Sequence, residues 1–197
     1  MSELFEDERF NSDDWYAREL ADAVFVRCSF SRVDMVESTS SGAVFEECSF
    51  ANVKLNVSVH RDSAFLRCRF VRCNFFDASF ERCKLTGCEL EGCDLRRLSV
   101  TSSDLSYASL RAADLRSATL REVRLREADL TDADCEGTDL TGADLRGASI
   151  DRARFVGADL RGSDLEGVDP RLAVLDRARI GAPQAIQLVQ ALGLDVG

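Results

Sequence analysis

Residues 143–147 read Ala-Asp-Leu-Arg-Gly, and residues 113–117 read Ala-Asp-Leu-Arg-Ser. The central position of this five-residue unit carries a large apolar residue almost without interruption from Phe5 to Ile180. The exceptions are Ser40, His60 and Pro170. A step of five residues turns a helix by about 140° and reverses sides on a flat strand, so neither element keeps these side chains on one face. The chain must therefore bend once per repeat, and four bends close a square coil of twenty residues.

A twenty-residue period is also visible in the sequence. Ala23-Val24-Phe25 recurs at residues 43–45, and Cys28-Ser29-Phe30 recurs at residues 48–50. Repeats of this length are typical of a solenoid, in which each unit buries its apolar face by stacking on its neighbours. The residue two before each centre is small, as at Ala143, and is expected to point inward as well.

These units resemble the motif of the pentapeptide-repeat proteins. The resemblance implies an all-β fold, a right-handed quadrilateral β-helix of about nine coils over residues 1–181, with a short C-terminal α-helix over residues 182–197. In that tail the five-residue register stops, Pro183 suits a helix start and Gly193 suits its end. The helix is expected to cap the open end of the solenoid, and it either serves only as a cap or also joins a second copy.

The cysteines and the single histidine do not predict chemistry. Seven of the eight cysteines fall on the small inward position, which favours buried, reduced thiols over disulfides or a metal site. His60 is expected to point inward on the same wall as Ser40, twenty residues earlier. We find no catalytic constellation and no cofactor motif, so the sequence predicts a protein that is not an enzyme and holds no cofactor or metal.

Acidic residues dominate the surface positions. The net charge is −10 and the calculated isoelectric point is near 4.7, which argues against nucleic-acid binding and favours basic protein partners. Residues 127–144 contain seven acids and no lysine or arginine. The alternative reading is a solvated acidic surface that confers only solubility, with arginines such as Arg116 and Arg146 partly neutralising it.

Within the pentapeptide-repeat proteins, the chain resembles the MfpA-type fluoroquinolone-resistance proteins. This similarity rests on the uninterrupted repeat, the Phe- and Cys-rich first half, the Ala-Asp-Leu-rich second half, Gln184-Ala185-Ile186, and Gly193-Leu194. It implies a homodimer formed through the C-terminal helix that inhibits DNA gyrase by imitating DNA. The implied partner-binding surface is a row of acids: Asp104, Asp114, Asp129, Asp134, Asp139, Asp144, Asp159 and Asp164. The implied dimer contacts are Ile186, Val189 and Leu192.

Location and alternative functions complete the expectations. The acidic start of the sequence differs from a targeting segment, and no apolar run is long enough to cross a membrane, so a cytoplasmic protein is expected. One alternative function is a structural or scaffolding rod with a different protein partner. Another is sequestration of a small antibiotic, which would require a pocket that a filled square core does not provide.

Overall fold

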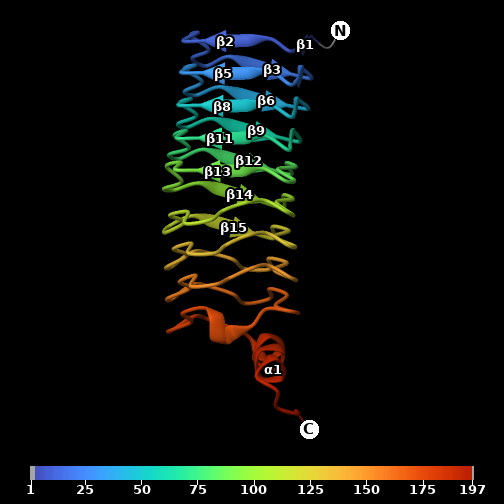
Figure 1. Ribbon diagram of the computed structural model, residues 1–197, viewed down its shortest axis with the longest axis vertical. Helices are drawn as coiled ribbons and strands as arrows, with labels where there is room; N and C mark the ends of the chain where they lie inside the picture. The colour runs from blue at the N-terminus through green and yellow to red at the C-terminus, as the bar shows by residue number, and fades with distance from the viewer. Residues whose placement is uncertain (1–2, 197) are drawn as a thin grey trace.

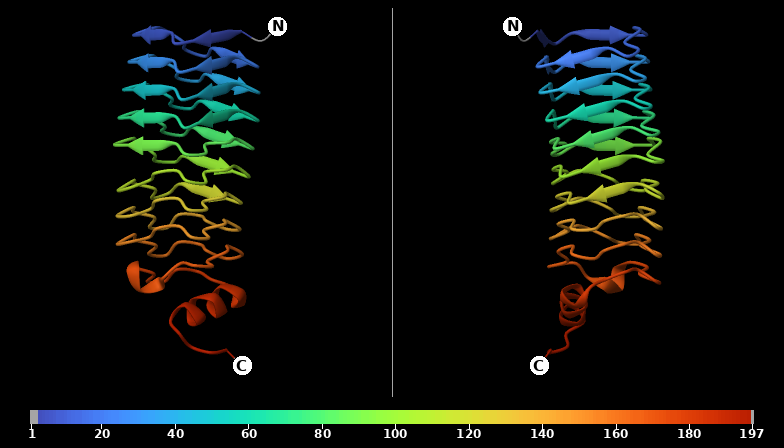
Figure 2. Two further views of the ribbon diagram at one scale, coloured as in Figure 1. Left: turned by 45° about the vertical axis from the view of Figure 1, so that its right-hand side comes forward. Right: turned by 180° about the vertical axis from the view of Figure 1, so that it is seen from behind.

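A computed structural model describes residues 3–196 as a straight, four-sided rod that winds as a right-handed β-helix (Figure 1). Successive coils lie one on another from the N-terminal to the C-terminal end, and a single helix follows the last coil (Figure 2). The fold class expected from the sequence is therefore confirmed.

Three of the four faces carry parallel three-residue strands in the described chain. The first face contains β1 (Leu4–Glu6), β4 (Val24–Val26), β7 (Val44–Glu46) and β10 (Ala64–Leu66). The second contains β2 (Arg9–Asn11), β5 (Ser29–Ser31), β8 (Ser49–Ala51), β11 (Arg69–Val71) and β13 (Glu89–Glu91). The fourth contains β3 (Glu19–Ala21), β6 (Thr39–Ser41), β9 (Val59–Arg61), β12 (Ser79–Glu81), β14 (Ser99–Thr101) and β15 (Thr119–Arg121). The third face is built from isolated bridges such as Asp14 with Asp34.

The register is constant at twenty residues. Phe5 pairs with Phe25, and Phe10 pairs with Phe30. The longest strand ladder has six strands, and single-residue bridges continue the same pairing beyond β15 to Arg179. Counted through both kinds of pairing, the column that starts at Glu19 has nine levels.

The core changes from aromatic to aliphatic along the rod. In the first half, phenylalanine rings stack directly above one another, with Phe25 and Phe45 4.7 Å apart and 5° from parallel. In the second half the same positions are mostly leucine, and Leu115 and Leu125 are completely buried. The residues two before the centres are buried as well, which explains why they must be small.

The corners require a left-handed backbone at the second residue after each centre. Glycine accepts this conformation freely, as at Gly147 with φ 66°. Many corners nevertheless carry other residues, and Val57 has φ 59° although its side chain is β-branched. Such a residue is disfavoured there because its Cβ approaches the following carbonyl.

The helix α1 (Ala182–Ala191) closes the C-terminal end of the rod and is preceded by a short 3₁₀ turn, η1 (Pro170–Leu172). Inside the rod, the amide of a central residue donates to a carbonyl of the next coil, as Leu145 does to Asp164 at 2.9 Å. At the last coil, the amide of Leu165 donates instead to the side chain of Gln187 at 3.1 Å. Similarly, the carbonyl of Ser163 accepts from the Gln184 side chain at 2.8 Å. Two glutamines thus replace backbone bonds of a tenth coil.

Candidate functional site

The eight aspartates predicted to bind a partner do not form a single row. Each precedes a central residue and is directed outward, as expected, but the five-residue step moves successive members from face to face. Asp104, Asp144 and Asp164 lie on the first face, Asp129 on the second, Asp114 and Asp134 on the third, and Asp139 and Asp159 on the fourth. The expectation of one continuous acidic row is therefore corrected to short vertical groups on all four sides.

Each of these eight aspartates also stabilises its own turn. One carboxylate oxygen accepts a hydrogen bond from the main-chain amide two residues later, at 2.9 Å from Ser106 to Asp104 and 3.0 Å from Thr131 to Asp129. The same contact recurs at the other six. Aspartate and asparagine favour this local bond, so the recurrence of aspartate in the repeat has a structural cause.

Arginines pair with all eight carboxylates. Arg116 lies 2.7 Å from Asp114, Arg161 lies 2.6 Å from Asp159, and Arg146 lies between Asp144 and Asp164 at 2.8 and 3.3 Å. The remaining four aspartates pair at 2.6–3.8 Å. The bond from Arg161 is the main cause that lowers the pKa of Asp159 to about 2. The adjacent guanidinium groups reduce the field of these carboxylates at the surface.

Uncompensated acids are concentrated at the other end of the rod. Among the described residues, six acids of the first coil have no lysine or arginine within ion-pair distance: Glu3, Glu8, Asp13, Asp14, Glu19 and Asp22. In the second half, six acids are likewise without such a partner in the described chain: Glu122, Glu127, Asp151, Glu166, Asp176 and Asp195. Their charge is visible in the sequence, but only the coil stacking shows which acids an arginine reaches.

Apolar side chains gather at the C-terminal end. Ile186 and Leu192 are 43% and 48% exposed, and Leu194 is 58% exposed, whereas Leu188 packs against the core. Val189 is partly buried. Of the three dimer contacts expected from the sequence, two are therefore open to a partner and the third is half covered. Leu172, Val174, Ile180 and Val196 add further exposed apolar surface in this region.

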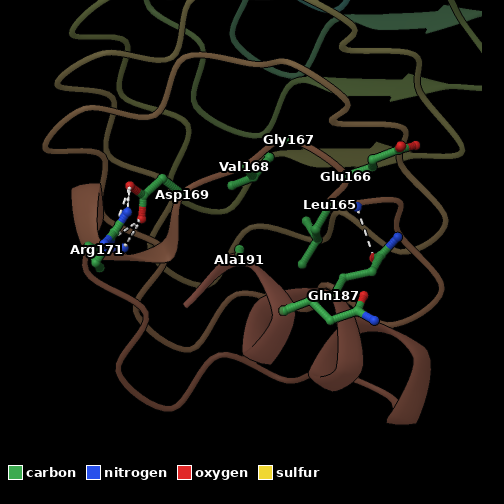
Figure 3. A pocket seen from close by; sticks show the side chains of 9 residues that line it. Leu165, Glu166, Gly167, Val168, Asp169, Arg171, Gln187 and Ala191 are labelled. Atoms are coloured by element: carbon green, nitrogen blue, oxygen red, sulfur yellow. Dashed lines mark hydrogen bonds and ion pairs between the residues drawn. The ribbon is translucent and has the colours of Figure 1, made fainter. Parts of the chain in front are cut away.

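A hollow of about 370 Å³ lies between the last coil and α1. Leu165, Val168 and Ala191 form its apolar part, and Gln187 extends across it toward the amide of Leu165 (Figure 3). Asp169 and Arg171 form an ion pair at its edge. The hollow is part of the exposed C-terminal apolar region.

His60 is inside the rod, as expected, and is 2% exposed. Its Nδ1 lies 2.8 Å from the Ser40 hydroxyl, and its Nε2 lies 3.0 Å from that of Ser58. Because Ser58 donates to the carbonyl of Leu55, it accepts from Nε2–H, which fixes the neutral tautomer. Burial lowers the pKa of His60 to about 3. The ring is a satisfied core group that substrate in solution does not reach.

The cysteines are free thiols: seven are buried and Cys93 is half-buried. The ladder of Cys28, Cys48, Cys68 and Cys88 donates to main-chain carbonyls 23 residues earlier, at 3.1–3.5 Å. Within residues 3–196, no group of three or more histidine, cysteine or acidic side chains is arranged to hold a metal ion. Over the same span, no helix has the length and apolar character needed to cross a bilayer.

Comparison with known families agrees with this architecture. A model described as a pentapeptide repeat region matches residues 73–150, and a second, described as pentapeptide repeats, matches residues 153–181. Together they span more than half of the chain. The chain belongs to the pentapeptide-repeat proteins. The repeats of residues 5–70 follow the same register in the structure although neither model reaches them.

Among solved structures, this pentapeptide-repeat protein is similar to QnrB1, a plasmid-mediated fluoroquinolone resistance protein. A trypsin-treated form of QnrB1 aligns with a TM-score of 0.90 over 100% of both chains, at 23% identity. HetL, which is involved in heterocyst differentiation regulation in the cyanobacterium Nostoc, aligns with a TM-score of 0.55 over 90% of this chain and 86% of its own, at 22% identity. At these identities the likeness shows the fold alone. A search of curated protein sequences finds no match.

Proposed function

We propose that this protein binds DNA gyrase in place of DNA, inhibits the enzyme and thereby protects the cell against fluoroquinolones. The observation that carries the proposal is the end-to-end agreement in shape with a fluoroquinolone resistance protein, which includes both the rod and its ends. The net charge of −10 and the uninterrupted, unbranched rod support it. The protein acts by binding and not by catalysis.

Rod length and charge set the strength of such mimicry. Nine levels at a strand spacing of about 4.8 Å make a rod on the order of 40 Å long, and two rods joined at their C-terminal ends would be about twice that length. The net charge then amounts to about one per 4 Å of rod, whereas B-DNA carries one per ~1.7 Å. The protein would therefore bind a basic groove with fewer ionic contacts than DNA makes.

The partner surface in this proposal includes the eight aspartates as members of ion pairs. If such an ion pair opens so that the aspartate can contact a cation on gyrase, little binding free energy is gained, because the carboxylate exchanges one cation for another. The unpaired acids of the second half meet a basic surface without this exchange. We therefore assign them the larger part of the electrostatic attraction.

The proposal predicts that DNA supercoiling by purified gyrase falls as the protein is titrated in, and that the effect weakens as salt is raised from ~50 to ~200 mM. A variant that neutralises four of these unpaired acids should inhibit several-fold less well. Its substitutions are Glu122→Gln, Glu127→Gln, Asp151→Asn and Glu166→Gln. Unimpaired supercoiling at large molar excess of the unmodified protein in low salt would reject gyrase as the target.

The ion pairing of all eight aspartates favours a second candidate, a scaffolding rod that spaces other proteins. A neutralised surface suits a solvated spacer better than a phosphate mimic. The two functions are separated by affinity capture from cells that contain gyrase: a scaffold would retain a partner set without a type II topoisomerase, and capture would be insensitive to the four-acid variant.

A further inference from the structure

The two ends of the rod are finished differently. At the C-terminal end, α1 and its two glutamines occupy the positions of a further coil. At the N-terminal end, the described residues begin with the first coil itself, and the top of the rod is flat in both views of Figure 2. The strands β1, β2 and β3 each lie at the end of their sheet.

The hydrogen-bond register shows which groups of β2 are unpaired. One coil later, the amide of Ser29 donates to the carbonyl of Glu8 at 2.9 Å, and the carbonyl of Ser31 accepts from Ser12 at 2.8 Å. A residue in either position therefore directs both its amide N–H and its carbonyl toward the preceding coil. The equivalent residues of β2 are Arg9 and Asn11, and in the described chain their main-chain groups meet no other strand.

The third face shows the contrast. There the outward amide of Tyr16 donates to the side chain of Asp14 at 3.0 Å, so this part of the end is satisfied internally. On β2 the corresponding position is Arg9, which has no acceptor to offer the amide of Asn11. The edge of β2 therefore keeps donors and acceptors available to an incoming strand.

The Phe10 ring and the nearby acids indicate which kind of partner strand would fit the edge of β2. The Phe10 ring stacks on Phe30 at 4.9 Å, has Trp15 edge-on at 4.9 Å, and is only partly buried, so part of the ring remains accessible at the end of the rod. Glu8, Asp13 and Asp14 surround the edge without ion-pair partners in the described chain. Two such ends would repel each other, whereas a strand with an aromatic residue between lysines or arginines matches both features.

We propose that the edge of β2 is a docking site for an extended, basic segment of another protein, which adds a strand to the second face and places an aromatic ring on Phe10. Strand addition to an open edge supplies main-chain hydrogen bonds, and the side chains supply selectivity. This inference does not rest on gyrase as the target. It concerns a different part of the rod from the eight aspartates and the C-terminal helix.

The test uses the full chain and a fluorescein-labelled peptide with one phenylalanine flanked by lysines. Binding is followed by fluorescence anisotropy, and amide hydrogen exchange is followed by NMR. We expect the peptide to slow exchange at Arg9 and Asn11. Arg9→Pro removes one outward amide N–H. It breaks no hydrogen bond to β5, because this amide points away from β5, and proline is tolerated at the start of an edge strand. It should weaken binding at least tenfold, whereas Arg9→Thr, which keeps the amide, should not.

Charge is tested by a matched pair of double variants. Glu8→Gln with Asp13→Asn should weaken peptide binding several-fold, and Asp176→Asn with Asp195→Asn, which removes equal charge far from the edge, should leave it unchanged. Equal losses of peptide affinity in both double variants would show nonspecific attraction and would overturn the proposed site. If the peptide did not slow amide exchange in β2 of the unmodified protein, the proposal would also be overturned, and this measurement does not depend on whether Arg9→Pro folds. Concentration-dependent association of the protein that Arg9→Pro abolishes would assign the edge to a second copy and also overturn the proposal.

Discussion

Asp159 illustrates how one side chain of this repeat serves two purposes. One of its oxygens accepts hydrogen bonds from the main-chain amide and the Nε of Arg161. The other accepts a hydrogen bond from Nη2 of the same arginine at 2.6 Å. The first bond holds the turn, and the second neutralises the charge. From the sequence alone such aspartates resemble a binding surface, because an outward position and a charge are visible while hydrogen-bond partners are not.

Burial of His60 makes stability depend on pH. Its pKa is about 3 in the folded protein, so the unfolded chain, with an ordinary value of 6.5, binds the proton first as the pH falls. The stabilisation is complete above pH 6.5 and should decline by about 1 kcal/mol per pH unit below it. Urea unfolding between pH 7 and pH 5 measures this slope. His60→Gln should flatten it, since this is the single histidine, and a flat profile in the unmodified protein would contradict the buried neutral ring.

Val57 should be a site of easy stabilisation. Its left-handed backbone and 45% exposed side chain mean that it contributes strain and little burial. Val57→Asn should raise the free energy of unfolding by about 1 kcal/mol, because asparagine tolerates this conformation. Val59→Asn, in the adjoining strand β9, provides the control and should lower it. A loss of stability in both variants would show that the Val57 side chain makes a contact worth more than the strain.

At the level of elements, α1 caps the rod because two of its side chains make the hydrogen bonds that the main chain of a further coil would make. Gln184 also accepts the amide of Gly181 at 3.0 Å, which fixes the start of the helix, while Gln187 reaches the Asp164 carboxylate at 2.9 Å. Pro183 and Gly193 predicted a helix in the tail. They did not reveal that two glutamines, and not the apolar residues alone, join that helix to the last coil.

Removal of the Gln187 side chain should destabilise the folded protein. Gln187→Ala leaves the amide of Leu165 without its acceptor and should lower the free energy of unfolding by about 1 kcal/mol or more. Gln190→Ala, on the exposed side of α1, should have little effect because alanine favours the helix. Chemical denaturation of the two variants decides the matter, and equal stabilities would mean that water replaces the glutamine without loss.

On the scale of the whole molecule, the rod has chemically distinct ends. The N-terminal end is acidic with open strand edges, and the C-terminal end is capped and apolar. Between them, acidic side chains on all four faces pair with arginines of the same or a neighbouring coil. Such a molecule is suited to end-to-end association at one end and to a basic partner at the other.

Self-association through the C-terminal end is the corresponding prediction. Ile186→Asp combined with Leu192→Asp should convert a dimer to a monomer in sedimentation equilibrium, because two charges would be buried at the contact. Tyr107→Asp is the matched control: this residue is 67% exposed but far from the helix. A double variant that sediments as the parent protein does would restrict α1 to its capping role.

The sequence by itself determined the square coil and the direction of each side chain, because a five-residue register repeated from Phe5 to Ile180 requires one bend per repeat. Beyond that register, Pro183 and Gly193 determined the presence of a C-terminal helix. The sequence also placed His60 and the thiols inside. Only the tertiary structure decided which charges are free. An ion pair such as Arg152 with Asp132 joins residues twenty positions apart, at 2.6 Å. Whether an arginine reaches an acid depends on stacking and on side-chain geometry, which a linear pattern does not contain.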